Sequence, residues 1–239
     1  MLWVVRVIGA LLAFMAAEMQ LHAALVTSPG AISNSVEVTF SEFTGALTFV
    51  TSPIQVGASV GEDILLSAVN PPPGSGTPLV GDPPPGNVPP VYGLGTNGFW
   101  DSGRIGFVGL NSETATMRFD FNDGLVNGVG GVVNYNPELT SQFTISALAQ
   151  DNTVLESYVI PTEAAVNTNS NPDNEGAFRG IFRSEGDIAA FTITGQNGVL
   201  DNLTFGPRQA VAVPEPSSLA ILGFGAIFAL NRRRLKQAS

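Results

Sequence analysis

Carboxylates, tyrosines and arginines are the only side chains in the central part of this chain that could carry acid-base chemistry. The 239 residues contain no cysteine, the one histidine is His22, and the one lysine is Lys236. Residues 25–212, the body of the chain, therefore lack His, Cys and Lys. This composition excludes Ser-His-Asp and Cys-His nucleophiles, Schiff-base lysines, histidine zinc sites, disulfides and the Walker lysine.

The body is strongly acidic, with eighteen Asp and Glu residues against five arginines and a formal charge of −13. We expect no nucleic-acid partner, because phosphate binding needs a basic surface. Hard cations such as calcium suit an acidic surface, since they take oxygen ligands. Two-carboxylate glycoside hydrolysis remains chemically permitted, but no motif pairs two of these acids, so we expect no enzyme.

Two further groups of side chains are candidates for binding or pairing. Sugar rings stack on Trp and Tyr, so Trp100 and Tyr92 are the candidate glycan-binding residues. The alternative is that Trp100 fills the core of a small β-domain. Arg179 and Arg183 share one face of an alternating segment, and we expect each to pair with a carboxylate.

Apolar and polar residues alternate along most of the body, which predicts half-buried strands. Turn sequences such as Asn122-Asp123-Gly124 separate them. The pattern therefore predicts an all-β fold, an antiparallel β-sandwich of the jelly-roll type. The clearest strands cover residues 36–40, 117–121, 143–148, 191–194 and 203–205.

Residues 70–90 interrupt this pattern, because they hold nine of the seventeen prolines. Proline-rich segments are stiff and lack the backbone donors that a sheet needs. The segment is either a long loop within one domain or a linker between two. We favour the loop, since the residues before it hold too few strands to close a core alone.

The C-terminal segment has the composition of a membrane anchor. Residues 217–230 contain no charge, Pro216 suits a first helical position, and Arg232, Arg233 and Arg234 follow. A helix of this length spans only about 21 Å, which leaves a buried core helix as the alternative. The basic cluster favours a short transmembrane helix with a cytoplasmic end.

This tail resembles the PEP-CTERM sorting signal of exported proteins in Gram-negative bacteria that make exopolysaccharide. Pro214, Glu215 and Pro216 match its motif, and residues 213–236 hold its motif, helix and basic end. The resemblance implies recognition by an exosortase, a membrane protease that removes the tail. It also implies transient anchoring in the inner membrane, followed by release to the cell surface or the extracellular space.

The N-terminal segment is typical of a secretory signal peptide covering residues 1–24. Arg6 provides the positive start, residues 7–17 are apolar, and cleavage is expected after Ala23 or Ala24. Glu18 near the end of the apolar run leaves an uncleaved anchor as the alternative. Either way, the body lies outside the cytoplasm.

A second resemblance covers the later part of the body and implies a β-domain shared with many exported PEP-CTERM proteins. Its last segment, residues 199–206, is also similar to the closing strand of jelly-roll carbohydrate-binding modules. That resemblance implies a structural calcium held by Asp201 and Glu42, with Asn202 where the modules have a second acid. The alternative is that these are ordinary strand-edge acids. The segments of the second resemblance are residues 129–135, 154–158, 176–181, 187–191 and 199–206.

Three function classes follow from these observations. The first is an exported envelope or matrix protein that binds exopolysaccharide. The second is a structural surface protein without a ligand. The third, and the least favoured, is a two-carboxylate glycosidase.

Overall fold

The computed structural model describes residues 23–43, 45–50, 52–71, 78–82, 94, 106–110, 112–166 and 176–209. All of them belong to one unit of the chain that ends at Gln209. Residues 1–22 of the predicted signal peptide and the whole sorting tail lie outside the described residues.

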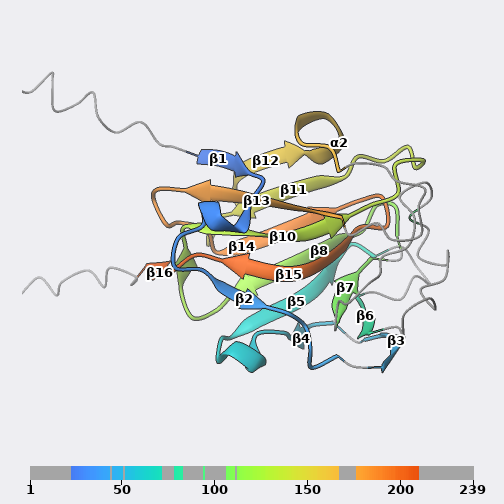
Figure 1. The fold of residues 1–239 in the computed structure, drawn as a ribbon, viewed down its shortest axis with the longest axis horizontal. Coiled ribbons are helices and arrows are strands. Elements are labelled where there is room, and N and C mark those ends of the chain that lie inside the picture. Colours follow the sequence, from blue (N-terminus) through green and yellow to red (C-terminus); the bar gives the residue numbers. More distant parts are fainter. Residues whose placement is uncertain are drawn as a thin grey trace, which may run out of the picture. The chain divides into compact units, whose positions relative to one another are not determined.

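About half of the described residues form two antiparallel sheets, as predicted from the alternation (Figure 1). A small third sheet pairs β16 (Arg208–Gln209) with β9 (Leu125–Val126). The eight-stranded sheet runs in the order β1 (Ala23–Val26), β13 (Ala177–Arg183), β10 (Gly128–Asn134), β15 (Val199–Phe205), β7 (Phe107–Gly109), β6 (Leu79–Asp82) and β3 (Gly45–Phe49), and β2 (Val36–Val38) also pairs with β15. The six-stranded sheet runs in the order β12 (Val154–Val159), β11 (Thr144–Leu148), β14 (Ala190–Thr194), β8 (Thr116–Phe121), β5 (Ile64–Val69) and β4 (Ile54–Gln55).

The strand order is that of a jelly roll, which confirms the predicted fold. Strands β7-β15-β10-β13 form half of the larger sheet, and strands β8-β14-β11-β12 form the facing part of the smaller one. Successive connections from β12 to β15 cross between the sheets, as two Greek keys require.

The core lies between the two sheets and is built from the apolar positions of the alternation. In β8, Met117 and Phe119 are fully buried, whereas Arg118 between them faces outward. The Phe119 ring lies 6.4 Å from the rings of Phe40 and Phe191, measured between centroids. These aromatic contacts join β8 to its sheet neighbour β14 and to the segment after β2. The apolar residues of the alternating pattern are therefore the ones that pack in the core.

The proline-rich segment contains a strand that its composition did not indicate. Leu79–Asp82 forms β6, which pairs with β7 on one side and β3 on the other. These four residues contain no proline, so their backbone N–H groups can join the sheet. Residues 72–77 and 83–90 lie outside the described residues.

A small second cluster covers the outer face of the eight-stranded sheet. Leu94 is buried there against Leu79, Phe107 and Val199. Satellite clusters of this kind form under long connections. The helical elements among the described residues are single turns, namely η1 (Pro29–Ala31), η2 (Ala58–Val60) and α2 (Ile160–Glu163).

Candidate functional site

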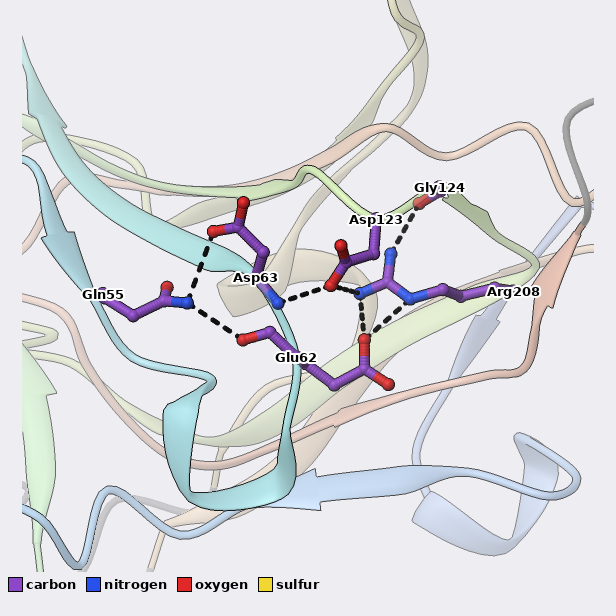
Figure 2. A network of polar contacts seen from close by, with 6 residues as sticks. All are labelled: Gln55, Glu62, Asp63, Asp123, Gly124 and Arg208. Atoms are coloured by element: carbon purple, nitrogen blue, oxygen red, sulfur yellow. Dashed lines mark hydrogen bonds and ion pairs between the residues drawn. The ribbon is translucent and has the colours of Figure 1, made fainter.

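A polar network fastens the last described strand to the body (Figure 2). The Arg208 Nε donates a hydrogen bond of 2.7 Å to Glu62 Oε2, and Arg208 Nη2 also pairs with this carboxylate. Arg208 Nη1 donates to the carbonyl of Gly124 at 3.0 Å, and Nη2 lies 3.4 Å from Asp123 Oδ2. The guanidinium therefore joins β16 to two turns that are distant in sequence.

Neighbouring groups hold those turns in place. Asp123 Oδ2 accepts a hydrogen bond of 2.6 Å from the Asp63 backbone N–H. Gln55 Nε2 donates to the Glu62 carbonyl at 3.0 Å and to Asp63 Oδ1 at 3.3 Å. We call the six residues of Figure 2 the Arg208 clasp: Gln55, Glu62, Asp63, Asp123, Gly124 and Arg208.

Replacing the arginine of the clasp is expected to release β16. We expect Arg208→Met to cost about 1–2 kcal/mol, because a half-buried charge-assisted contact to Glu62 is lost. Hydrogen exchange at residues 206–209 should become faster. Arg118→Met is the matched control, since the carboxylate that Arg118 contacts among the described residues is Asp120, on the same outer face of β8. Unchanged protection of residues 206–209 in Arg208→Met would contradict the prediction.

The two arginines of β13 have different partners: Arg183 contacts carboxylates, whereas Arg179 contacts backbone carbonyls. Arg183 pairs with three carboxylates, those of Asp187, Glu156 and Glu185, as expected. The hydrogen bond to Asp187, the largest contribution, raises the pKa of Arg183. Arg183 lies on β13 and Glu156 on β12, so this pair links the two sheets.

Arg179 differs from the expectation, because its described acceptors are backbone carbonyls rather than a carboxylate. Its Nε and Nη2 donate to the carbonyls of Ala164 and Ala165 at 2.5 and 2.6 Å. Its Nη1 donates to the Phe178 carbonyl at 2.6 Å. Burial lowers the pKa of Arg179, and burial raises the pKa of the nearby Tyr135. Arg179 thus holds the segment after α2 against β13.

The outer face of the six-stranded sheet carries hydroxyl side chains in two adjacent rows, together with Arg118, Asp120 and apolar residues such as Leu65 and Val69. Strand register aligns Ser67, Arg118, Thr192, Ser146 and Ser157 in one row across five strands. The next row includes the directly paired residues Thr116, Thr194 and Thr144. The hydroxyl face consists of Ser67, Thr116, Thr144, Ser146, Ser157, Thr192 and Thr194.

The hydroxyls of this face are partly paired with one another. Thr116 Oγ1 lies 2.8 Å from Thr194 Oγ1, and Ser146 Oγ lies 2.9 Å from Ser157 Oγ. A hydroxyl has one donor and two acceptor lone pairs, so each pair retains capacity for a ligand. The sequence carried a signal for this face, because the polar positions of residues 144–146 and 192–194 are all Ser or Thr.

Of the two residues predicted to hold calcium, Asp201 is buried and Glu42 is exposed. Asp201 is buried in β15, and its Oδ1 accepts a hydrogen bond of 2.6 Å from the Asn202 N–H. Glu42 lies exposed in the turn after β2. The early acid that contacts the closing strand is Glu37, whose Oε1 accepts a 2.6 Å hydrogen bond from Asn202 Nδ2. Among the described residues, no three His, Cys, Asp or Glu side chains form a group that could hold a metal ion.

The other predicted site residues lie outside the described part of the chain. These are the glycan candidates Trp100 and Tyr92. The same holds for the sorting motif and its basic end: Pro214, Glu215, Pro216, Arg232, Arg233 and Arg234. Of the two body tyrosines that are described, Tyr135 is buried and stacks on Phe143, with 4.7 Å between ring centroids.

Comparison with known proteins identifies the tail. The model of the PEP-CTERM protein-sorting motif matches residues 212–234, which confirms the prediction made from the Pro-Glu-Pro sequence and the arginines. The match implies exosortase processing, export with transient membrane anchoring, and location at the surface. Neither the curated proteins nor the solved structures gave a match to this chain. Within the part of the chain that the structure describes, no helix is long and apolar enough to cross a membrane.

Proposed function

We propose that this chain is an exosortase-sorted surface or matrix protein whose jelly-roll body binds a neutral exopolysaccharide on the hydroxyl face. The sorting motif at residues 212–234 supports the route to the surface. The observation that carries the binding proposal is the alignment of hydroxyl side chains in register across neighbouring strands.

The hydroxyl face suits a sugar chain in both chemistry and size. Sugar hydroxyls donate and accept hydrogen bonds, as do Ser and Thr side chains. Five strands at about 4.8 Å spacing present a surface roughly 19 Å across. The side chains of Thr144 and Ser146 are short and partly exposed, so that an extended chain can approach the sheet at β11. Such a site binds by many weak contacts rather than by one deep pocket.

The charge of the body favours a neutral polysaccharide over an acidic one. The formal charge of −13 repels anionic ligands at low ionic strength. The one arginine in the aligned row, Arg118, is paired with Asp120 at 2.6 Å, so its charge is balanced locally. A neutral ligand loses nothing to this repulsion.

Affinity electrophoresis through gels containing neutral exopolysaccharide tests the proposal. We expect retardation of the wild-type protein, reduced at least about fivefold in the double variant Thr144→Val with Ser146→Ala, because two hydrogen-bonding groups are lost at about 0.5–1.5 kcal/mol each. Thr162→Val in α2 is the control, since this exposed hydroxyl lies outside the hydroxyl face. Equal retardation of the double variant and wild type would contradict the location of the site.

Two other results would favour the alternative functions. Wild-type migration that no glycan changes would favour a structural surface protein without a ligand. Shortening of the polysaccharide during the assay would favour the two-carboxylate glycosidase.

A further inference from the structure

Both ends of the described chain lie at the same end of the sandwich. β1 begins at Ala23, which pairs with Arg183 at the end of β13. The Arg183 N–H donates a 2.6 Å hydrogen bond to the Asn127 carbonyl. The preceding residue, Val126, pairs with Arg208 in β16. The first and last described strands are therefore linked through the end of β13 and residues 126–127, at one end of the sandwich (Figure 1).

The turns at this end, which we call the signal end, are acidic. They connect β8 to β9, β11 to β12 and β13 to β14, and they include the turn before β5. Among the described residues of these turns and of the strand ends beside them, the positive charges are Arg183, the last residue of β13, and Arg208 in β16. The acids are Glu62, Asp63, Asp123, Asp151, Glu185 and Asp187.

The opposite end of the sandwich is fixed by a second set of turns, which we call the distal end. The Asn136 N–H donates to the Gln196 carbonyl at 2.9 Å, and the Gln196 N–H donates to the Glu113 carbonyl at 3.1 Å. These bonds join the connections β10 to β11, β14 to β15 and β7 to β8. The distal end is a strand length away from the signal end.

The chain between the body and the apolar run of the sorting tail is short. Residues 210–216 separate β16 from the apolar run that begins at Ser217. Seven residues reach at most about 25 Å when fully extended. We call residues 210–216 the tether. The Arg208 clasp keeps β16 bound to the body, so the residues of β16 do not detach and lengthen the tether.

We infer that the signal end docks on the membrane protease that processes the tail. The Arg208 clasp holds in place β16, the strand from which the tail continues. The inference rests on the sorting route of the proposed function, not on glycan binding. Before cleavage, residues 210–216 hold the end of β16 within about 25 Å of the start of the apolar run, and the distal end is the end of the sandwich opposite this connection. A protein partner fits this surface better than lipid, because an acidic surface gains nothing from anionic headgroups.

Site-specific photo-crosslinking tests this orientation. The chain has no cysteine, so single cysteines can be introduced and labelled with a benzophenone maleimide. Asn122→Cys places the probe on an exposed turn of the signal end, and Glu138→Cys places it on an exposed turn of the distal end. Both are expressed as the full chain in cells whose exosortase is catalytically inactive, so that the uncleaved protein accumulates. We expect at least about fivefold more exosortase adduct from position 122, because the tether raises its effective concentration.

Three results would overturn the inference. They are equal or greater adduct formation from position 138, adducts from position 122 to lipid alone, and no adduct from either position while the uncleaved protein accumulates at the membrane. Inserting about ten Gly-Ser residues after Ala212 should bring the ratio of adduct from position 122 to adduct from position 138 closer to one. The reason is that a longer flexible tether lets the body rotate. An unchanged ratio would show that the short tether does not cause the difference between the two positions. The outcome is independent of the affinity electrophoresis, so failure of glycan binding and failure of docking are distinguishable.

Discussion

Gly130→Ala is expected to destabilise the body by about 3 kcal/mol, because the added methyl group has no space in the middle of the eight-stranded sheet. A Cβ at this position would lie 2.5 Å from the Arg179 carbonyl oxygen and 2.6 Å from the Gly180 Cα. It would also lie 2.9 Å from Cζ of Phe178. Two of these atoms belong to the β13 backbone, so β10 and β13 must separate to make room.

Urea unfolding followed by far-UV circular dichroism measures this effect. Gly30→Ala is the matched control, because a Cβ there meets only Ser28 Oγ, at an ordinary 3.6 Å. We expect the control to stay within about 0.5 kcal/mol of wild type. Equal midpoints for Gly130→Ala and Gly30→Ala would show that the sheet relaxes around the new methyl group.

Arg183→Met is expected to cost about 3 kcal/mol, because it leaves three carboxylates facing one another without a cation. The Arg183 side chain is 7% exposed and binds Asp187 through two hydrogen bonds, of 2.7 and 2.9 Å. It also donates to Glu156 Oε1 at 3.0 Å and lies 3.7 Å from Glu185 Oε2. Loss of the contact to Glu156 removes a bridge between the sheets as well.

Thermal unfolding at low and high ionic strength separates charge repulsion from lost packing. At low salt the variant should melt well below wild type, and in about 1 M NaCl the difference should shrink, because salt screens the repulsion among the partly exposed carboxylates. Arg118→Met provides the comparison and should cost less than about 1 kcal/mol, since its pair with Asp120 is partly exposed to solvent. A deficit in Arg183→Met that does not change with ionic strength would indicate lost packing alone.

The predictions for Gly130 and Arg183 differ in how far each could be made from the sequence alone. Gly130 and Gly180 stand in the segments that resemble exported PEP-CTERM proteins, but the glycine-rich residues 128–131 have the composition of a turn, whereas the structure places them in β10. The need for glycine at position 130 was not readable from the sequence, because Gly130 faces Gly180 only through the register of β10 with β13. The pairing of Arg183 with a carboxylate was expected from charge balance, but the choice of Glu156 depends on how the two sheets pack.

The residue sequence by itself determined the features that depend on local pattern. Alternation of apolar and polar residues predicted the strands of the sandwich, since side-chain direction in a strand has a period of two. The sorting tail was readable because its motif, apolar run and arginines follow one another directly. The absence of His, Cys and Lys from the body excluded whole classes of chemistry without any structure.

Only the tertiary structure decided which distant residues meet. Arg208 contacts Glu62 across 146 positions of sequence, and Glu37 rather than Glu42 meets Asn202 because β2 pairs with β15 in one particular register. The hydroxyl face likewise exists only when five strands align. Such contacts depend on strand pairing and sheet packing, which involve the whole chain at once, whereas periodicity reports only on each segment and its immediate neighbours.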